Sequence, residues 1–333
     1  MMEKRMSAEE VYSLQLLHGC CGTYSLDGYT GFSRFTPGQL AYYGERSDTD
    51  FLRSHCWAGI YLECVTDEPE ISFTYRLYLE KGFYVMNSGI DLWENGVFAA
   101  HWTVDPAETG DVTVTYRRKR REPSVIRLVF PNGCVLLPLE FRLGDAHPTA
   151  KRERTILFYG DSITQSAYIP NPSLSWYHPV ADHLGAEYLN RGIGSMIFDE
   201  ASLPEESDCR PDWIFIEYGA NDLGKTPDND TALASADAWM KKLCRLYPDA
   251  EKYILLPDFF PEEGESEAIL RRRDPYCEGL TAIGNPLGVN VLSGRPLIPA
   301  LPSMYCADLV HFNEAGSAVF AGNLLYAVRN RRK

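Results

Sequence analysis

The pattern of apolar residues changes once along the chain, near residue 150. Between Phe51 and Leu143, apolar and polar residues alternate with a period of two, and turn residues separate the alternating segments. The alternation is clearest over Ile71–Leu79. About seven short strands at regular spacing, with no helical pattern between them, are typical of a β-sandwich, and a jelly-roll-like one is expected here.

After residue 150, short apolar segments alternate with longer segments of helical period. This alternation predicts a parallel sheet with helices on both of its faces. A polar segment with one proline, residues 144–154, is typical of a linker. We therefore predict an accessory β-sandwich domain over residues 1–148 and an α/β domain over residues 149–333. Expected strands of the second domain are 155–159, 186–189, 213–218 and 252–256, and its expected helices are 176–184, 231–246, 265–273 and 313–330.

Three segments within the first 86 residues carry weaker signals. Ser7–Leu17 is expected to form a short helix, with Ser7 and Glu10 at the spacing of a capping box. Gly19–Tyr43 is rich in glycine and aromatic residues and is expected to be irregular or short-stranded. Gly82–Met86 is expected to be a further strand of the sandwich.

Composition argues against several partners. The formal net charge is −14, and a nucleic acid or an anionic membrane requires a basic face. The only dense basic run, Arg117–Arg121, is expected to be a solvated turn. We find no signal segment and no apolar run of about 18 residues, so we expect a cytoplasmic protein. Nine cysteines without C-x-x-C pairs favour reduced thiols.

Four polar stretches stand where strands of the second domain end or a helix begins. They are Gly160–Thr164, Asn190–Ser195, Gly219–Asp222 and Asp308–His311. Each alone resembles an ordinary turn or helix cap. The carboxyl ends of parallel strands share one edge of the sheet, and active sites lie there. We therefore expect the four stretches to meet.

Their residue types fit acyl transfer. Ser162 supplies a hydroxyl, His311 a base for its proton, and Asp308 a carboxylate that holds the imidazole. Expected donors to an oxyanion are the Ser162 N–H, a backbone N–H of the glycine-rich second stretch and the Asn221 amide.

Other residues of these stretches have simpler expected roles. Asp161 is expected to cap the helix after Ser162, and Asp222 is expected to be structural. Tyr159, Tyr218 and Trp176 flank the stretches, where shaping a pocket and packing in the core are equally open.

Together the four stretches resemble those of the SGNH, or GDSL-type, hydrolases over residues 155–329. The resemblance implies a flavodoxin-like α/β/α fold and serine-dependent ester hydrolysis without metal or cofactor. It makes Ser162 the nucleophile, His311 and Asp308 its base and the base's partner, and Asn221 an oxyanion donor. The position of the family's oxyanion glycine, counted from Asn190, is Ser195, and Gly194 stands one residue earlier, so both stay candidates.

Two further segments are similar to a subgroup of this family. Gly89–Trp93 resembles the Gly-x-Asp-Leu-Tyr signature of a β-sandwich domain that precedes certain GDSL hydrolases, with Trp93 in place of tyrosine. Asn171–Trp176 resembles the segment after the nucleophile in that subgroup. The resemblance implies an esterase of acylated carbohydrates, with a small acetylated sugar as substrate and an acyl-serine intermediate. A homo-oligomer stays open.

Three alternatives remain at this stage. The same residues would serve an acyltransferase, or a lipase or thioesterase, and the chain could instead be a non-catalytic carbohydrate-binding protein. A strongly apolar groove would favour lipid, whereas an open polar cleft with aromatic walls would favour sugar.

Overall fold

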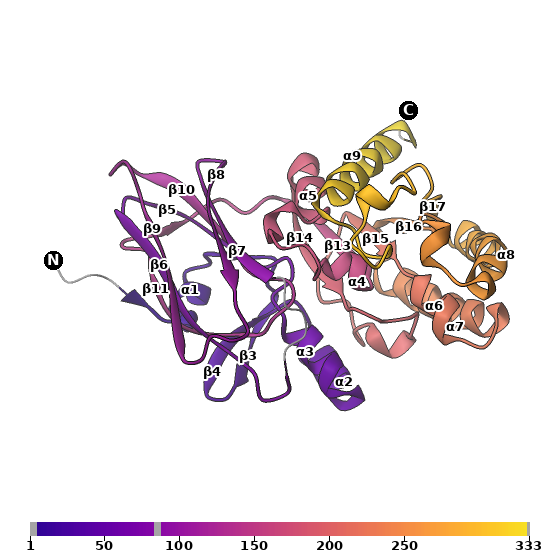
Figure 1. Cartoon of the computed structure of the whole chain (residues 1–333), viewed down its shortest axis with the longest axis horizontal. Coiled ribbons are helices and arrows are strands. Elements are labelled where there is room, and N and C mark those ends of the chain that lie inside the picture. The colour runs from indigo at the N-terminus through magenta and orange to yellow at the C-terminus, as the bar shows by residue number, and fades with distance from the viewer. Residues whose placement is uncertain (1–4, 83–87, 332–333) are drawn as a thin grey trace.

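A computed structural model describes residues 5–82 and 88–331 of the 333-residue chain. Figure 1 shows two parts side by side, antiparallel sheets in the first half of the chain and a parallel sheet with helices in the second. This is the predicted division of fold types. The predicted boundary between residues 148 and 149 remains a prediction, because several contacts described below cross it.

The first part contains two antiparallel sheets that enclose one core. One sheet has the order β1-β11-β6-β9, and the other has the order β12-β5-β10-β7-β8 with β2 paired to β5. Phe73 and Tyr75 of the first sheet pack in the same buried cluster as Leu62 and Ile126 of the second, which confirms the β-sandwich. The strands are β1 (Arg5–Met6), β2 (Leu17–His18), β5 (Tyr61–Thr66), β6 (Glu70–Leu77), β7 (Ser88–Glu94), β8 (Val97–Val104), β9 (Asp111–Arg117), β10 (Ser124–Val129), β11 (Leu136–Arg142) and β12 (His147–Pro148).

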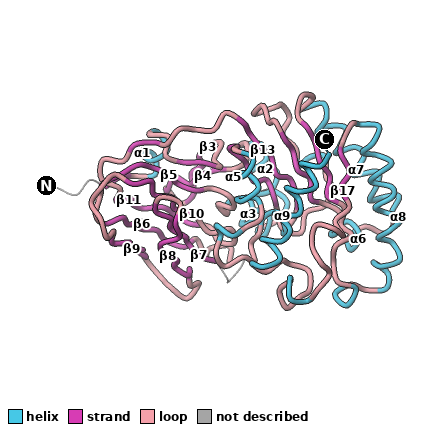
Figure 2. Tube along the Cα trace, turned by 90° about the horizontal axis from the view of Figure 1, so that it is seen from above, coloured by secondary structure: helices cyan, strands magenta, loops and turns pink. Residues whose placement is uncertain are grey.

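The second part is a three-layer α/β/α structure. Its parallel sheet has the order β14-β13-β15-β16-β17, which is the flavodoxin-like order 2-1-3-4-5. Figure 2 shows the helices of this part in cyan and its strands in magenta. Alternate residues of β13 pack with different helices: Ile156 and Phe158 share a buried cluster with α5 (Tyr177–Leu184) and α9 (Glu314–Arg331), whereas Leu157 and Tyr159 share one with α7 (Asn229–Leu246) and α8 (Glu267–Gly284). The strands are β13 (Arg154–Gly160), β14 (Ala186–Gly192), β15 (Trp213–Glu217), β16 (Glu251–Leu255) and β17 (Asn290–Leu292).

Helices α5, α7 and α9 agree with the sequence prediction to within two residues at each end, whereas α8 continues past the predicted end at residue 273 to Gly284. Two of these helices have side-chain N-caps. The Asp228 side chain accepts a hydrogen bond from the Thr231 N–H at the start of α7, and the Ser266 side chain accepts one from the Ile269 N–H at the start of α8. Helix α4 is the helix expected after Ser162, whereas the short helix α6 and the short strand β17 were not predicted, because too few residues carry their period. The helices are α4 (Ser162–Gln165), α5 (Tyr177–Leu184), α6 (Ala220–Lys225), α7 (Asn229–Leu246), α8 (Glu267–Gly284) and α9 (Glu314–Arg331).

The N-terminal segment both confirms and corrects its predictions. Helix α1 (Ala8–Ser13) has the predicted capping box of Ser7 and Glu10. The stretch expected to be irregular forms a hairpin, β3 (Gly22–Leu26) and β4 (Tyr29–Ser33), and then continues as two helices, α2 (Pro37–Arg46) and α3 (Asp48–His55). A second capping box, of Thr36 and Gln39, starts α2 and was overlooked in the sequence. The expected strand Gly82–Met86 falls almost entirely outside the described residues.

Helix α2 contributes to the core of the parallel sheet. Phe35 and Tyr43 are buried in the same cluster as Leu157, Tyr159 and Ile193. Figure 1 shows α2 and α3 beneath the junction of the two parts. The first 60 residues therefore contribute to both cores.

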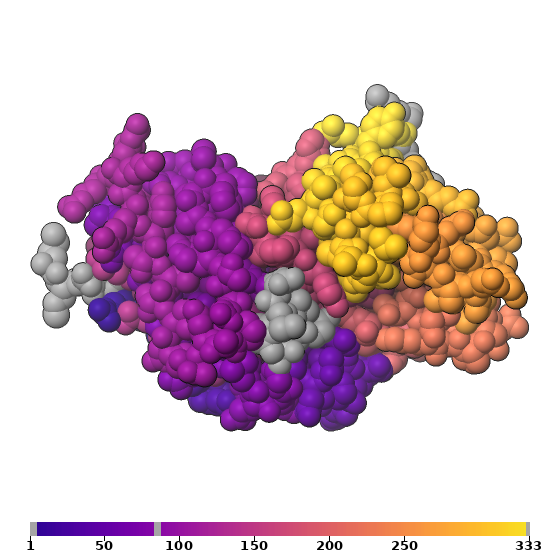
Figure 3. All heavy atoms as spheres, viewed as in Figure 1, coloured from indigo at the N-terminus to yellow at the C-terminus, as the bar shows by residue number. Residues whose placement is uncertain are grey.

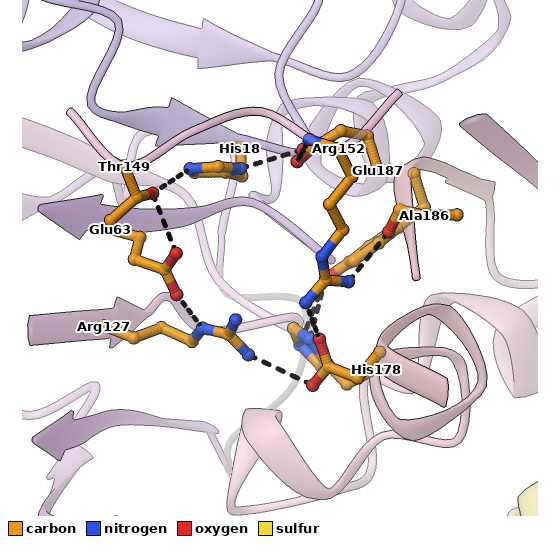
Figure 4. A network of polar contacts seen from close by, with 10 residues as sticks. His18, Glu63, Arg127, Thr149, Arg152, His178, Ala186 and Glu187 are labelled. Carbon is orange, nitrogen blue, oxygen red and sulfur yellow. Dashed lines mark hydrogen bonds and ion pairs between the residues drawn. The ribbon is translucent and has the colours of Figure 1, made fainter. Parts of the chain in front are cut away.

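A polar network on the opposite side of the junction also joins the two parts (Figure 4). Glu63 of β5 accepts hydrogen bonds from Arg127 Nε at 2.6 Å and from Thr149 Oγ1 at 2.9 Å. Arg152 donates to the carbonyl oxygen of Ala186 at 2.9 Å, and His18 Nδ1 lies 2.8 Å from Glu187 Oε2. The ion pair of Glu63 and Arg127 is only partly exposed, so solvent screens it less than a surface pair.

A hollow of about 880 Å³ lies beside this network. Residues of both parts line it, among them Trp93 of β7 and Leu174. In Figure 3 the upper edge of the molecule is indented between the sandwich and the last helix. Of the tryptophans of the sandwich part, Trp57 is fully buried in the core, whereas Trp93 borders this hollow.

Other sequence-level expectations concern cysteines and membranes. All nine cysteines are free thiols, and Cys56, Cys64, Cys134 and Cys277 are buried. Within residues 5–82 and 88–331, none of the helices has the length and apolar character needed to cross a bilayer.

One buried side chain, Arg34, links the N-terminal segment to the parallel sheet. Its Nη1 donates to the carbonyl oxygens of Asn190 and Gly192, both at 2.7 Å. Its Nε donates to the carbonyl oxygen of Cys56 at 3.0 Å, and its Nη2 to that of Arg53 at 2.8 Å. A guanidinium without solvent contact is therefore held by four carbonyl groups.

We predict that Arg34→Met lowers the free energy of unfolding by about 3–5 kcal/mol, because it leaves buried carbonyl groups without donors. Urea unfolding curves measure the loss. Arg271→Met is the control, since Arg271 is exposed and forms only a surface ion pair, and we expect a change below about 1 kcal/mol there. Equal midpoints for the two variants would contradict the role given to Arg34.

Candidate active site

The turn Gly160–Ser162 connects β13 to the short helix α4. A Cβ atom at Gly160 would lie 2.5 Å from the Glu217 carbonyl oxygen and 2.1 Å from Thr164 Oγ1, so only glycine allows the turn to sit this close to β15. Asp161 Oδ1 accepts the Ile163 N–H at 3.0 Å, which is the expected helix cap. Ser162 is the first residue of α4 and stands at the carboxyl edge of the sheet.

His311 and Asp308 come from the loop before α9 and reach Ser162. His311 Nε2 lies 2.8 Å from Ser162 Oγ, and His311 Nδ1 lies 2.6 Å from Asp308 Oδ2. Partial burial tends to raise the pKa of Asp308. Hydrogen bonds from the His311 ring and from the N–H groups of Val310 and His311 outweigh it and lower that pKa below its usual value. Asp308 is therefore ionised at neutral pH and orients the imidazole.

Tyr168 covers the imidazole from one side. The rings of Tyr168 and His311 are stacked, with centroids 3.7 Å apart and planes 18° apart. Tyr168 follows α4 in a segment that carried no sequence signal, and sequence reasoning missed it.

Asn221 lies across the pocket, in the first turn of α6. Gly219, with φ of +120°, makes the sharp turn from β15 into this helix. The Asn221 side-chain amide donates to Asp161 Oδ2 at 2.7 Å. Asp161 thus does more than cap α4, because it also holds the side chain expected to bind an oxyanion.

The structure separates the two candidates of the second stretch. The Gly194 N–H donates to Gln165 Oε1 at 2.8 Å, so this donor is already occupied. Ser195, in the left-handed region with φ of +64°, lines the same pocket as Ser162 and Asn221. Of these two candidates, Ser195 is the one that lines this pocket.

A cavity of about 200 Å³ opens in front of Ser162 and His311. Its wall is mixed, with apolar and aromatic side chains next to charged ones. Arg53 comes from α3 of the N-terminal segment and Glu265 from the loop before α8, and neither was singled out in the sequence. Further lining residues are Asp161, Ile163, Tyr168, Ser195, Ala220, Asn221, Phe260, Gly264, Ile269 and Val310.

Three aromatic residues left open in the sequence prove to be core residues. Tyr159, Tyr218 and Trp176 are each at most 2% exposed, and none of them lines the cavity. Trp176 donates its indole N–H to the Ile163 carbonyl oxygen at 3.0 Å and so supports α4 from beneath.

Asp222 is also buried, as a structural residue would be. Its Oδ1 accepts the Phe198 N–H at 3.1 Å, and its Oδ2 has no hydrogen-bond partner among the described residues. Burial, with repulsion from Asp161, raises the pKa of Asp222 to about 7.

The sheet order and the contact of serine, histidine and aspartate at its carboxyl edge define the class of flavodoxin-like, SGNH-type hydrolases. Residues 158–319 match the model of the GDSL-like Lipase/Acylhydrolase family. The match begins within β13 and ends within α9, so it includes all four polar stretches. No curated protein gave a significant sequence match.

Solved structures resemble the chain at low sequence identity. Salicylyl-acyltransferase SsfX3 from a tetracycline biosynthetic pathway has a TM-score of 0.79 at 16% identity, covering 98% of this chain and 97% of that one. A GDSL-like lipase from Bacteroides ovatus, whose assignment is itself provisional, has a TM-score of 0.75 at 15% identity, with 98% and 97% covered. The acetyl xylan esterase Est2A from Butyrivibrio proteoclasticus has a TM-score of 0.59 at 16% identity, with 82% and 90% covered. The first two extend over both parts, so the combination of sandwich and hydrolase fold recurs.

We predict that Asp222→Asn alters the pH dependence of stability. A carboxyl group with a pKa near 7 in the folded protein and near 3.8 when unfolded binds more protons in the folded state between those values. The stabilising contribution of Asp222 is therefore lost as the pH rises from about 4 to about 7. Thermal unfolding across this range should show a smaller decline in Asp222→Asn. Asp230→Asn, in the first turn of α7 and exposed, serves as control. Parallel curves for Asp222→Asn and the wild type would contradict the burial argument.

Proposed function

We propose that this protein is a serine esterase that removes O-acetyl groups from small carbohydrates through an acyl-serine intermediate. The observation that carries the proposal is the continuous contact from Ser162 Oγ through His311 to Asp308, which faces a small cavity. The family whose model matches residues 158–319 supports hydrolysis of acyl esters in general.

In the proposed mechanism, His311 Nε2 takes the proton from Ser162 Oγ as the oxygen attacks the ester carbonyl carbon. Asp308 keeps the Nδ1–H in place and stabilises the imidazolium. The N–H groups of Ser162 and Ser195 and the Asn221 amide bind the tetrahedral oxyanion. The imidazolium then protonates the departing sugar oxygen, which leaves an acetyl-serine. His311 next takes a proton from water as the water oxygen attacks the acetyl carbon. The bond from that carbon to Ser162 Oγ then breaks, the imidazolium returns its proton to Oγ, and acetate is released.

The preference for a short acyl group rests on the size of the cavity. About 200 Å³ in front of Ser162 is below the range of pockets that hold drug-sized ligands, about 300–1,000 Å³. A long acyl chain would need an extended apolar groove. The charged side chains of Arg53 and Glu265 interrupt the apolar wall instead.

The preference for a sugar rests on the same wall. Charged and amide groups beside the rings of Tyr168 and Phe260 suit a ligand with hydroxyl groups and an apolar face. The acetyl xylan esterase among the similar structures acts, by its name, on an acetylated polysaccharide, which favours this substrate class over lipid.

Transfer of the acyl group to an acceptor other than water is the second candidate. The structure with the higher TM-score, named a salicylyl-acyltransferase, aligns with both parts of the chain, whereas the acetyl xylan esterase covers 82% of it. The two reactions share the acyl-serine and differ only in the hydroxyl that attacks it. A purely carbohydrate-binding role is disfavoured, because it would not require the close contact of Ser162 with His311.

We predict that Ser162→Ala lowers kcat for p-nitrophenyl acetate by about 10³-fold or more, because it removes the nucleophile. Release of p-nitrophenolate measures the rate. Ser303→Ala, at an exposed serine outside the cavity, is the matched control and should keep wild-type activity. Equal rates for Ser162→Ala and the wild type would refute the catalytic assignment.

We also predict that kcat/KM falls steeply from acetyl to octanoyl esters, because longer chains exceed the cavity. A second experiment incubates the protein with acetylated sugars, with and without a free alcohol. Chromatography then measures how much acetate is released and how much is transferred to the alcohol. A maximum at octanoate would favour a lipase. Products consisting mainly of the transferred ester would favour the acyltransferase.

A further inference from the structure

Two buried carboxyl groups lie beneath the candidate oxyanion donor. Asp161 follows β13, and Glu217 is the last residue of β15, and both are 1% exposed. The Asp161 N–H donates to the Glu217 carbonyl oxygen at 3.2 Å, which fixes the two residues side by side. The proposed mechanism gives no role to Glu217.

The hydrogen-bond partners of the two carboxyl groups differ. Asp161 accepts two N–H donors, from the Ile163 backbone at 3.0 Å and from the Asn221 amide at 2.7 Å. Glu217 Oε2 accepts the hydroxyl of Thr164 at 2.9 Å, and the backbone N–H of Asp161 also acts as a donor that lowers the pKa of Glu217. Donors of this kind favour the ionised form of the group that accepts them.

The two carboxyl groups also interact with each other. A side-chain hydrogen bond between them lowers the pKa of Asp161 and raises that of Glu217. Such a bond needs one proton, since two carboxylates would only repel. Burial, together with the charge of Asp161, raises the pKa of Glu217 well above its usual value.

We propose that Glu217 is a positioning residue that stays protonated and donates its carboxyl proton to ionised Asp161, which in turn holds the Asn221 amide toward the oxyanion. This inference rests on the proposed function, because it assumes that Asn221 binds the oxyanion. This chain of hydrogen bonds involves no change in covalent bonds, and Glu217 acts on the reaction only through Asp161 and Asn221.

Charged groups from several elements face this pair. His311, from the loop before α9, attracts Asp161 and opposes the effect of burial on its pKa. Asp222 and Lys225, both on α6, interact electrostatically with Asp161. The negative charge of Asp161 also contributes to the raised pKa of the Tyr218 hydroxyl. Among these groups, the proton on Glu217 prevents a second negative charge directly beside Asp161.

A purely structural role would predict a different behaviour. If the pair only stabilised the fold, substitutions in it would change stability or KM by the same amount whether or not the Asn221 side chain is present. If it positions Asn221, loss of Asp161 should lower kcat and leave KM nearly unchanged, and the loss should disappear once Asn221 is absent.

The first test is a double-mutant cycle with Asp161→Asn and Asn221→Ala, measured as kcat and KM for p-nitrophenyl acetate. Asp161→Asn retains a side-chain oxygen for the Ile163 cap. We expect Asn221→Ala to lower kcat by about 10²–10³-fold and Asp161→Asn by about tenfold or more. In the Asn221→Ala background, Asp161→Asn should cost less than about twofold. Additive losses would overturn the proposal.

The second test addresses the proton on Glu217. Glu217→Gln keeps a donor toward Asp161 and an acceptor for Thr164, so kcat at neutral pH should stay within about threefold of the wild type. The wild type should lose activity at alkaline pH where Glu217 ionises, and Glu217→Gln should lack this loss. A large loss at neutral pH in Glu217→Gln, or an identical alkaline profile, would overturn the proposal.

A third measurement does not depend on activity. The infrared difference spectrum of the wild type minus Glu217→Gln at neutral pH should contain the carbonyl stretch of a protonated carboxylic acid. Absence of this band would show that Glu217 is ionised and would overturn the proposal. If Ser162→Ala matched the wild type while the band was present, the proposed function would fail and the shared proton would stand.

Discussion

The candidate active site depends on how closely α4 approaches three strands. A Cβ atom at Gly160 would collide with the Glu217 carbonyl oxygen, and one at Gly192 would lie 2.4 Å from the Gln165 nitrogen. Two glycines on neighbouring strands therefore allow a helix of one turn to sit at the sheet edge. In this position Ser162 faces the loop of His311. The Gln165 side chain accepts the Gly194 N–H, and the Asp161 carboxyl group accepts a hydrogen bond from the Asn221 amide.

The N-terminal half of the chain takes part in the architecture of this edge. Arg34 holds the carbonyl oxygens of Asn190 and Gly192, just before the loop that presents Ser195. Its Nη2 also binds the backbone of Arg53, whose side chain lines the cavity. The segment from residue 34 to residue 55, which contains α2 and α3, is thus a structural element of the site. Its removal would disturb both the loop that presents Ser195 and the cavity wall.

Sequence reasoning found what is encoded locally. The change of period near residue 150 predicted both fold types, and the polar stretches at strand ends brought Ser162, Asn221 and His311 to one edge. Contacts between distant residues have no such local signature, and Arg34, Arg53 and Tyr168 were missed for this reason. Helix α2 is a different kind of miss, because its capping box was readable and the surrounding glycines and aromatic residues concealed it.

Electrostatics then limits how this edge can work. Asp161, Glu217 and Asp222 are all buried near the cavity, in a chain whose formal net charge is already −14. Three ionised carboxylates would oppose the negative charge that an acyl transition state places on the oxyanion. Burial raises the pKa of each of them, and that of Asp222 reaches about 7, whereas N–H donors from Ile163 and Asn221 and the nearby His311 counteract this effect on Asp161. In the proposed arrangement Glu217 keeps its proton and Asp161 carries the charge that binds the Asn221 amide, so the acidic residues support the reaction that their full ionisation would inhibit.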